Sequence, residues 1–168
     1  MKTLILVRHA KAEPENELGD HMRALSSAGR QQAQLLGALI TEQSEPVTRV
    51  LVSSALRTKE TYRLIATTEG QWPSGTSLDA IYEAGPRDLI DLLHECDEND
   101  HCVMVVGHEP TISSLASMLH DSRDDIAQQV RLGVPTATAC ILDVPVAWDE
   151  IDRNTCQLRA VVRPDLVA

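Results

Sequence analysis

The sequence contains no phenylalanine, and aromatic residues make up only 2% of it. Proteins that bind nucleic-acid bases usually stack them on aromatic side chains, and few are available here. Positive charge is also scarce, because 15 lysines and arginines stand against 25 aspartates and glutamates, for a formal net charge of −10. Nucleic acids and anionic membranes attract basic surfaces. We therefore expect neither as a partner, and any anion site must be a local positive pocket.

Long apolar runs and clustered cysteines are missing as well. No stretch approaches the roughly 18 apolar residues of a membrane helix, and the run after Lys2 is too short for a signal-peptide core. The four cysteines include no C-x-x-C pair and no cluster at zinc-ligand spacing, so we expect reduced thiols. The expectation is a cytoplasmic protein. Its 168 residues, 43% of them apolar, can bury a sizeable core and predict one domain over 1–168.

Short apolar runs alternate with segments of helical periodicity along the chain. Strands are predicted at 3–7, 49–53, 102–106, 138–144 and 157–162. Helices are predicted from about 26 to 42, after Ser54 and Thr111 as N-caps, and from Gly85-Pro86 onward. The segment 71–77 is predicted to be a loop. This alternation is typical of a three-layer α/β/α domain with a mostly parallel central sheet.

Polar residues follow three of the predicted strands at the point where each strand ends. These residues are Arg8 and His9, then the segment 53–57, then His108 after Gly107. In open α/β sheets, ligands bind beyond the carboxyl ends of the strands. We therefore expect the three segments to meet at one edge of the sheet.

Two histidines and two arginines at one edge would repel each other unless an anion lay between them, and phosphate is the natural occupant. The planar fork of Arg8 or Arg57 suits phosphate oxygens, and the helix after Ser54 adds backbone N–H donors. The same cations disfavour protonation of His9, which keeps a ring nitrogen free to attack phosphorus. Taken singly, each of these residues fits an ordinary surface position.

Four ordered motifs surround these residues. The segment 6–12, LVRHAKA, resembles the opening motif of the histidine phosphatase superfamily, in its small branch of phosphohistidine phosphatases. The segments 20–29, 53–58 and 106–110 resemble that branch's D-x-x-R-x-L-T-x-x-G, S-x-A-x-R-x and V-G-H-N-P patterns. The sequence departs from the branch at Ser54, where proline is expected, and at Glu109, where asparagine is expected.

The resemblance implies a phosphoglycerate mutase-like fold and a role for each matching residue. His9 would take the phosphoryl group, while Arg8, Arg57 and His108 would hold its oxygens and stabilise the transferring group. No cofactor or metal is implied, because the pocket is cationic and lacks a carboxylate cluster for Mg²⁺. Segment 20–23 either borders the pocket or is a solvated loop.

Glu83 falls roughly where larger relatives place the carboxylate that protonates the leaving oxygen, although a surface glutamate fits the pattern equally well. Phosphohistidine-directed members often lack this acid, since a protonated phosphoimidazole leaves readily without it. The short stretch between His9 and His108 also leaves little room for the helical cap that encloses small substrates in other members.

Three functions remain open from the sequence. The first is hydrolysis of phosphohistidine on a partner protein, such as a histidine phosphotransfer domain of a signalling relay. The second is a phosphatase or mutase acting on a small phosphorylated metabolite. The third is a catalytically silent phosphate-binding module, against which the intact set of Arg8, His9, Arg57 and His108 argues.

Overall fold

A computed structural model describes residues 1–164, and in this part of the chain six strands form one sheet. The strands are β1 (Lys2–Arg8), β2 (Arg49–Ser53), β3 (Gly75–Leu78), β4 (Cys102–Gly107), β5 (Thr138–Val144) and β6 (Gln157–Val162). Their order across the sheet is β3-β2-β4-β1-β5-β6. The first four in this order are parallel, and β5 runs antiparallel to both of its neighbours. The sheet is therefore mixed but mostly parallel, as the alternation of elements predicted.

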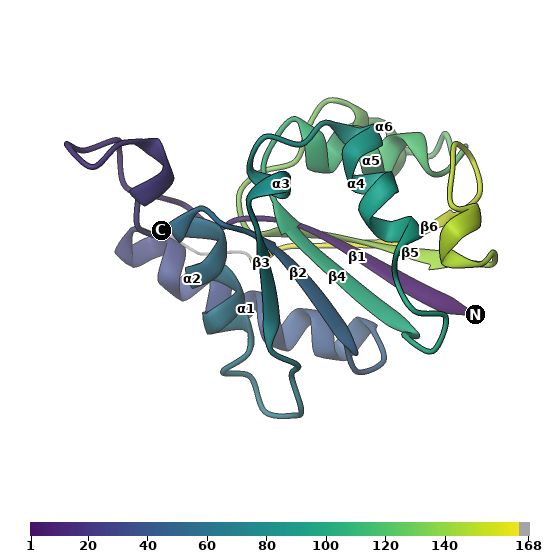
Figure 1. The fold of residues 1–168 in the computed structure, drawn as a ribbon, viewed down its shortest axis with the longest axis horizontal. Coiled ribbons are helices and arrows are strands. Elements are labelled where there is room, and N and C mark those ends of the chain that lie inside the picture. Colours follow the sequence, from purple (N-terminus) through teal and green to yellow (C-terminus); the bar gives the residue numbers. More distant parts are fainter. Residues whose placement is uncertain (165–168) are drawn as a thin grey trace.

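Helices cover both faces of the sheet (Figure 1). One layer holds α1 (Ser27–Gln43) and α2 (Leu56–Ile65). The other holds α3 (Asp79–Tyr82), α4 (Pro86–His94), α5 (Thr111–Met118) and α6 (Asp125–Arg131). Two short 3-10 turns complete the elements, η1 (Asp20–Met22) and η2 (Trp148–Glu150). This is a three-layer α/β/α architecture, as predicted.

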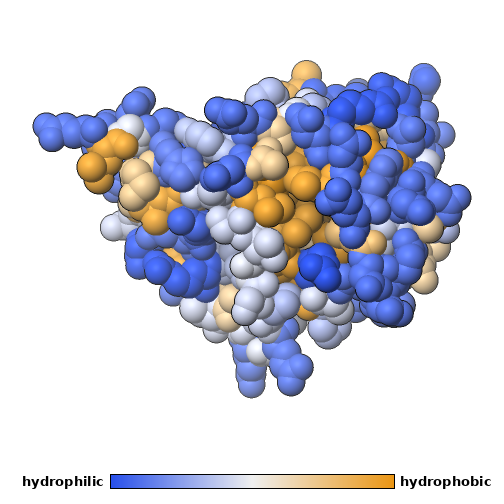
Figure 2. All heavy atoms as spheres, in the orientation of Figure 1, coloured by the Kyte–Doolittle hydropathy of each residue, from blue (hydrophilic) through white to orange (hydrophobic). Residues whose placement is uncertain are grey.

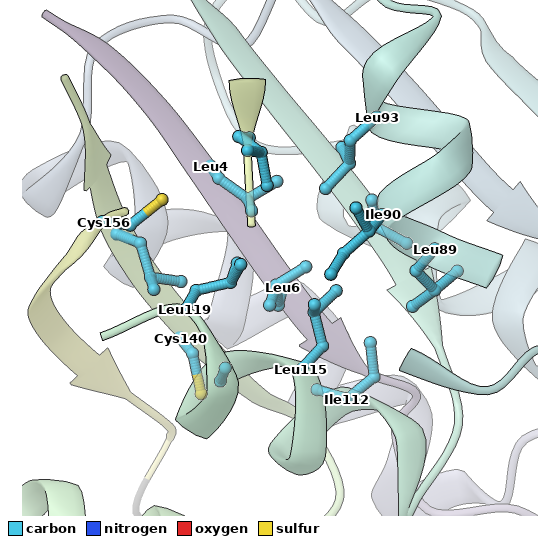
Figure 3. Packing of buried hydrophobic residues seen from close by; sticks show 14 of the residues in the cluster. Leu4, Leu6, Leu89, Ile90, Leu93, Ile112, Leu115, Leu119, Cys140 and Cys156 are labelled. Carbon is cyan, nitrogen blue, oxygen red and sulfur yellow. The ribbon is translucent and has the colours of Figure 1, made fainter. Parts of the chain in front are cut away.

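Strand β1 runs through the centre of the core, and its alternate side chains face the two helix layers. Leu4 and Leu6 are fully buried among side chains of α4 and α5, including Leu93 and Leu115 (Figure 3). Ile5 and Val7 are equally buried on the other face, in the cluster with apolar residues of α1 and α2. A strand covered on both faces explains why its sequence is a continuous apolar run rather than an alternating one.

Strand register brings the chain segments of interest to one edge. Arg8 of β1 pairs with Gly107 of β4, so His9 and His108 both follow directly after that paired position. The backbone N–H of His9 donates to the Gly107 carbonyl at 3.1 Å, which extends the pairing by one step. Strand β2 is in parallel register with β4 up to Val52 and Val106, and it ends one residue later at Ser53.

Helix caps and one loop differ from the sequence-based predictions. The N-cap of α2 is Ala55 rather than Ser54, and α5 begins at Thr111 after Pro110 as its N-cap. Segment 71–77, predicted to be a loop, contains the start of β3, a short edge strand whose first residues are exposed and polar. Such a strand has no apolar alternation to reveal it. The helix α6 was not predicted either.

The surface in the same view is largely hydrophilic, with an apolar patch between β3 and α4 (Figure 2). A hollow of about 350 Å³ in this region is lined by Leu51, Leu78, Leu92 and Cys96 together with charged residues. Within residues 1–164, no helix has the length and apolar character needed to span a bilayer.

Gly37 offers a test of the packing between α1 and α2. A Cβ atom added there would lie 2.6 Å from the Ile65 carbonyl oxygen and would also collide with the Thr68 hydroxyl. Replacement of a helical glycine by alanine normally raises the free energy of unfolding by up to about 1 kcal/mol. We expect Gly37→Ala instead to lower the free energy of unfolding by about 1–3 kcal/mol, the usual cost of overpacking. Urea denaturation measures this, and Gln34→Ala, at an exposed position of the same helix, should stay within about 0.5 kcal/mol of the wild type.

Candidate active site

His9 lies just beyond β1 with its side chain held in one orientation. Its Nδ1 is 2.7 Å from the carbonyl oxygen of Ala10. A carbonyl oxygen only accepts hydrogen bonds, so Nδ1 carries the ring proton and Nε2 keeps a free lone pair. Within the described residues no hydrogen bond engages Nε2. The ring therefore presents an unprotonated nitrogen of fixed orientation.

The surroundings of His9 also keep it neutral. The pKa of His9 is lowered to about 3, with burial as the largest cause; the hydrogen bond to Ala10 opposes the shift, and the nearby His108, Arg57 and Arg8 add to it. Only 8% of the residue is exposed. The sequence pointed to the cations as the reason for a neutral His9, but burial is the larger cause.

His108 faces His9 from the end of β4, with the two ring centroids 5.5 Å apart. Arg57 Nη2 lies 3.4 Å from Nδ1 of His108, and a guanidinium only donates, so Nδ1 is an acceptor. The proton is then on Nε2, which lies 2.7 Å from the hydroxyl of the buried Ser53. Burial, followed by the charge of Arg57, lowers the pKa of His108 to about 4. Both imidazoles are thus neutral near pH 7.

Arg57 sits in the first turn of α2, as predicted, and is 6% exposed. Its Nη1 donates to the backbone carbonyl of Asp20 at 2.8 Å, and its Nη2 donates to the carboxylate of Asp20 at 3.1 Å. Its Nε is buried without a partner among the described residues. Asp20 therefore fixes the guanidinium plane next to His108.

Asp20 is itself held by two further side chains. The Tyr82 hydroxyl donates to its Oδ2 at 2.6 Å, and Arg23 donates to its Oδ1 at 3.1 Å. These hydrogen bonds, that of Tyr82 first, and the charge of Arg57 hold the pKa of Asp20 well below its usual range. Asp20 is consequently an ionised acceptor with no proton to give near neutral pH.

Tyr82 is a site residue that the sequence interpretation missed. Its ring lies edge-on to His108 and His21, with centroid distances of 5.6 and 4.7 Å. His21 in turn places Nε2 2.9 Å from the Ser54 hydroxyl. Segment 20–23 therefore borders the site and is not a purely solvated loop. The rule that polar residues gather after strand ends would have pointed towards Tyr82 had β3 been recognised.

Arg8 is half-buried beside His9, and burial lowers the pKa of its guanidinium. Its Nη1 donates to the carbonyl oxygen of Val134 at 2.8 Å. Its Nε is buried without a partner in the described part of the chain. Arg8, His9, Arg57 and His108 thus gather at one edge of the sheet, and each keeps a fixed hydrogen-bond partner.

Glu83 is exposed and directly follows Tyr82 at the end of α3. Among residues 1–164, no hydrogen bond or ion pair engages its carboxylate. Those residues also contain no group of three or more histidine, cysteine, aspartate or glutamate side chains arranged to hold a metal ion.

Comparison with known proteins identifies the family. Residues 4–78 match the family model described as "Histidine phosphatase superfamily (branch 1)". The uncharacterised protein Rv1276c of Mycobacterium tuberculosis is 31% identical over 155 residues, which cover 90% of this chain and 96% of that protein. The chain belongs to the histidine phosphatase superfamily.

Several solved structures share the fold of this chain. SixA from Nakamurella multipartitia superposes with a TM-score of 0.86 at 24% identity, covering 97% of this chain and 96% of that one. The protein histidine phosphatase SixA complexed with tungstate gives 0.78 at 17% identity, covering 96% of each chain. The mycobacterial glucosyl-3-phosphoglycerate phosphatase Rv2419c gives 0.68 at 16% identity, covering 95% of this chain and 97% of that one. Family and fold together support a phosphatase.

The protonation state of His9 can be measured directly. Because its pKa is lowered to about 3, His9 should stay neutral from pH 7 down to pH 5 in the folded, unliganded protein, with the proton on Nδ1. In urea the same side chain should titrate near its ordinary value of about 6.5. Nitrogen NMR of histidine-labelled protein, assigned with His9→Gln, reads both ring nitrogens. Protonation of Nε2 between pH 7 and pH 6 in the folded protein would contradict this account.

Proposed function

We propose that this protein hydrolyses phosphohistidine on a partner protein, with His9 as the nucleophile. The observation that carries the proposal is the neutral His9, which keeps a free Nε2 and lies close to His108, Arg57 and Arg8. A nucleophile needs a lone pair, and a phosphoryl group needs donors around its oxygens. Both requirements are met at the same edge of the sheet.

The reaction proceeds in two transfers. Nε2 of His9 attacks phosphorus of a substrate phosphohistidine whose other ring nitrogen carries a proton. The bond from phosphorus to the substrate ring breaks, and its electron pair stays on the departing nitrogen, so the substrate leaves as a neutral imidazole. Phosphorylated His9 retains its Nδ1 proton, which the Ala10 carbonyl accepts as a hydrogen bond while the ring is positive. Water then attacks phosphorus, the bond to Nε2 breaks, both protons of water remain on the phosphate product, and His9 returns to its neutral tautomer.

Arg8, Arg57 and His108 stabilise the transferring group. The guanidinium donors of Arg8 and Arg57 would surround the phosphoryl oxygens in a partly water-excluded site, where preorganised charge contributes most to the rate. Asp20 keeps the Arg57 guanidinium in place through two hydrogen bonds, so little reorganisation is needed when the phosphoryl group arrives. The neutral His108 would take up a proton and become a donor to the phosphoryl group when a dianion lies beside it, because an opposite charge raises the pKa of an imidazole.

The shortage of proton donors favours phosphohistidine over a phosphate ester. An ester oxygen needs a proton as it leaves, whereas a protonated imidazole does not. Asp20, the carboxylate hydrogen-bonded to Arg57, is ionised, and Glu83 is exposed and makes no hydrogen bond to any residue in 1–164. The higher TM-scores to SixA structures are in line with this choice, and tungstate in one of them is a tetrahedral oxyanion like phosphate.

A small phosphorylated metabolite is the alternative substrate. It is favoured by the same fold in a glucosyl-3-phosphoglycerate phosphatase and by the position of Glu83 directly after Tyr82, a residue of the site. The two substrates can be ranked by kcat/KM. We expect a protein bearing phosphohistidine to exceed a panel of sugar and alkyl phosphates by about a hundredfold or more. The reverse ranking would replace the proposal by its alternative.

The covalent intermediate gives a direct test of His9. Brief reaction with labelled substrate should leave an acid-labile, alkali-stable phosphoryl group on His9, and His9→Gln should give neither label nor turnover. Label on Ser53 or Ser54 would point to a different mechanism.

Arg57 should be essential for catalysis, whereas Arg63 on the same helix should not. Loss of a preorganised donor to the reacting group typically costs roughly 3 kcal/mol, so Arg57→Ala should lower kcat/KM by at least about a hundredfold. Arg63→Ala is the matched control, because Arg63 lies on the same helix with its side chain 65% exposed and paired to Glu60. Its kcat/KM should stay within about twofold of the wild type. Similar losses in both variants would remove Arg57 from the mechanism.

Glu83→Gln separates the two substrate classes. With phosphohistidine the variant should turn over at nearly the wild-type rate, whereas side activity on alkyl phosphates should fall by about a hundredfold if Glu83 supplies the proton. An aryl phosphate with an acidic phenol is the internal control, since its leaving group needs no proton. An equal, large loss on all three substrates, with an unchanged thermal melt, would assign Glu83 to phosphate binding instead.

A further inference from the structure

Glu109 follows His108 directly, yet its carboxylate is directed to other partners. Within residues 1–164 it makes no hydrogen bond to His108. Its Oε1 accepts from the Ser113 backbone N–H at 2.7 Å, and its Oε2 accepts from the Ser113 hydroxyl at 2.7 Å. Oε2 also accepts from the backbone N–H of Val134 at 3.0 Å. The carboxylate thus joins the first turn of α5 to a turn that is distant in the sequence.

The turn at Val134 leads back to the phosphate site. The carbonyl oxygen of Val134 accepts the hydrogen bond from Arg8 Nη1 at 2.8 Å, and this is the one hydrogen bond of the Arg8 guanidinium within the described residues. Val134 is 6% exposed, so water competes little for its peptide groups. Glu109 and Arg8 are therefore connected through Val134. The Val134 backbone N–H donates to Glu109, and the Val134 carbonyl oxygen accepts from Arg8.

The turn is shaped to pass close to the carboxylate. Gly133 has φ +114°, a conformation that residues with a Cβ rarely adopt, and a Cβ there would lie 3.3 Å from Oε2 of Glu109. The close approach of Gly133 to the Glu109 carboxylate and the hydrogen bond from the Val134 N–H to the same carboxylate together fix the turn against α5. Ser113 is 4% exposed and holds the carboxylate from the other side.

We propose that Glu109 is a positioning residue, which aims the Arg8 guanidinium at the phosphoryl oxygens through Val134. The proposal rests on the function proposed above, in which Arg8 binds the phosphoryl group. The negative charge of Glu109 has a second effect on Arg8, since it opposes the lowering of the guanidinium pKa by burial. Glu109 differs in this from a catalytic residue, because it supports the site without touching the reacting atoms.

Glu109→Gln distinguishes a positioning role from a simple charge effect, because the two predict opposite changes in the affinity for an oxyanion. A carboxylate near an anion site repels the anion, so its removal alone would tighten oxyanion binding. The glutamine amide has one oxygen where the carboxylate has two, so it cannot accept from both the Ser113 and the Val134 backbone N–H, and the connection from α5 to Val134 is broken at one end. If Glu109 positions Arg8, the variant should bind tungstate about tenfold more weakly than the wild type in isothermal titration calorimetry, and its KM should rise more than its kcat falls.

Two further variants assign the effect. Ser113→Ala removes one buried hydrogen bond to Glu109 but leaves that to Val134, so its tungstate affinity should stay within about twofold of the wild type even if its thermal melt is lowered. In an Arg8→Gln background, Glu109→Gln should change tungstate affinity by less than about twofold, because the residue through which it acts is gone.

The outcomes distinguish this inference from the proposed function. Unchanged or tighter binding by Glu109→Gln, with wild-type protein binding tungstate normally, would overturn the positioning role alone. An undiminished tenfold loss in the Arg8→Gln background would overturn it as well, because Glu109 would then act by another route. Failure of the wild-type protein to bind tungstate at all would overturn the proposed function and this inference with it.

Discussion

Parallel pairing of β1 with β4 is the constraint on which the site depends. With Arg8 opposite Gly107, the residues that follow the two strands leave the sheet at the same level, and the rings of His9 and His108 come within 5.5 Å of each other. A slip of one residue would turn each side chain of β1 to the opposite face. That slip would move Leu4 and Leu6 out of their layer, so burial of the strand fixes the register and the register fixes the site.

Burial also determines the chemistry of the two histidines. A cluster of cations on an exposed surface would be screened by water and salt, and its effect on a neighbouring imidazole would be modest. Here the surrounding protein excludes water from His9 and His108, and this exclusion is the first cause of both lowered pKa values. The core therefore supplies more than a scaffold, because it keeps His9, the proposed nucleophile, in the protonation state that nucleophilic attack requires.

Much of this arrangement could be predicted from the sequence, and the misses have physical reasons. The strands that carry Arg8, Ser53 and Gly107 are continuous apolar runs, so their ends were predicted to within one residue. Tyr82 was missed because β3 is a short, exposed edge strand whose sequence resembles a loop.

The direction in which a side chain points also cannot be read from the periodicity of the sequence. Glu109 follows a strand end just as His108 does, but its carboxylate is directed to Ser113 and Val134. Those partners lie on α5 and on the turn before β5, and only their arrangement in space selects the rotamer. Ser54 behaves similarly, since its hydroxyl contacts His21 and does not cap α2.

The reversed direction of β5 has a consequence for how this site can change during evolution. Because β5 runs against β1, it begins at the edge where the parallel strands end, and the backbone N–H of Ala137 donates to the His9 carbonyl at 3.0 Å. The connection from α6 into β5 therefore forms one wall of the site. Connections of this kind accept insertions and substitutions more readily than the strands that they join. A change in this single connection would thus alter one side of the proposed phosphate site, while the sheet that aligns the two histidines stays unchanged.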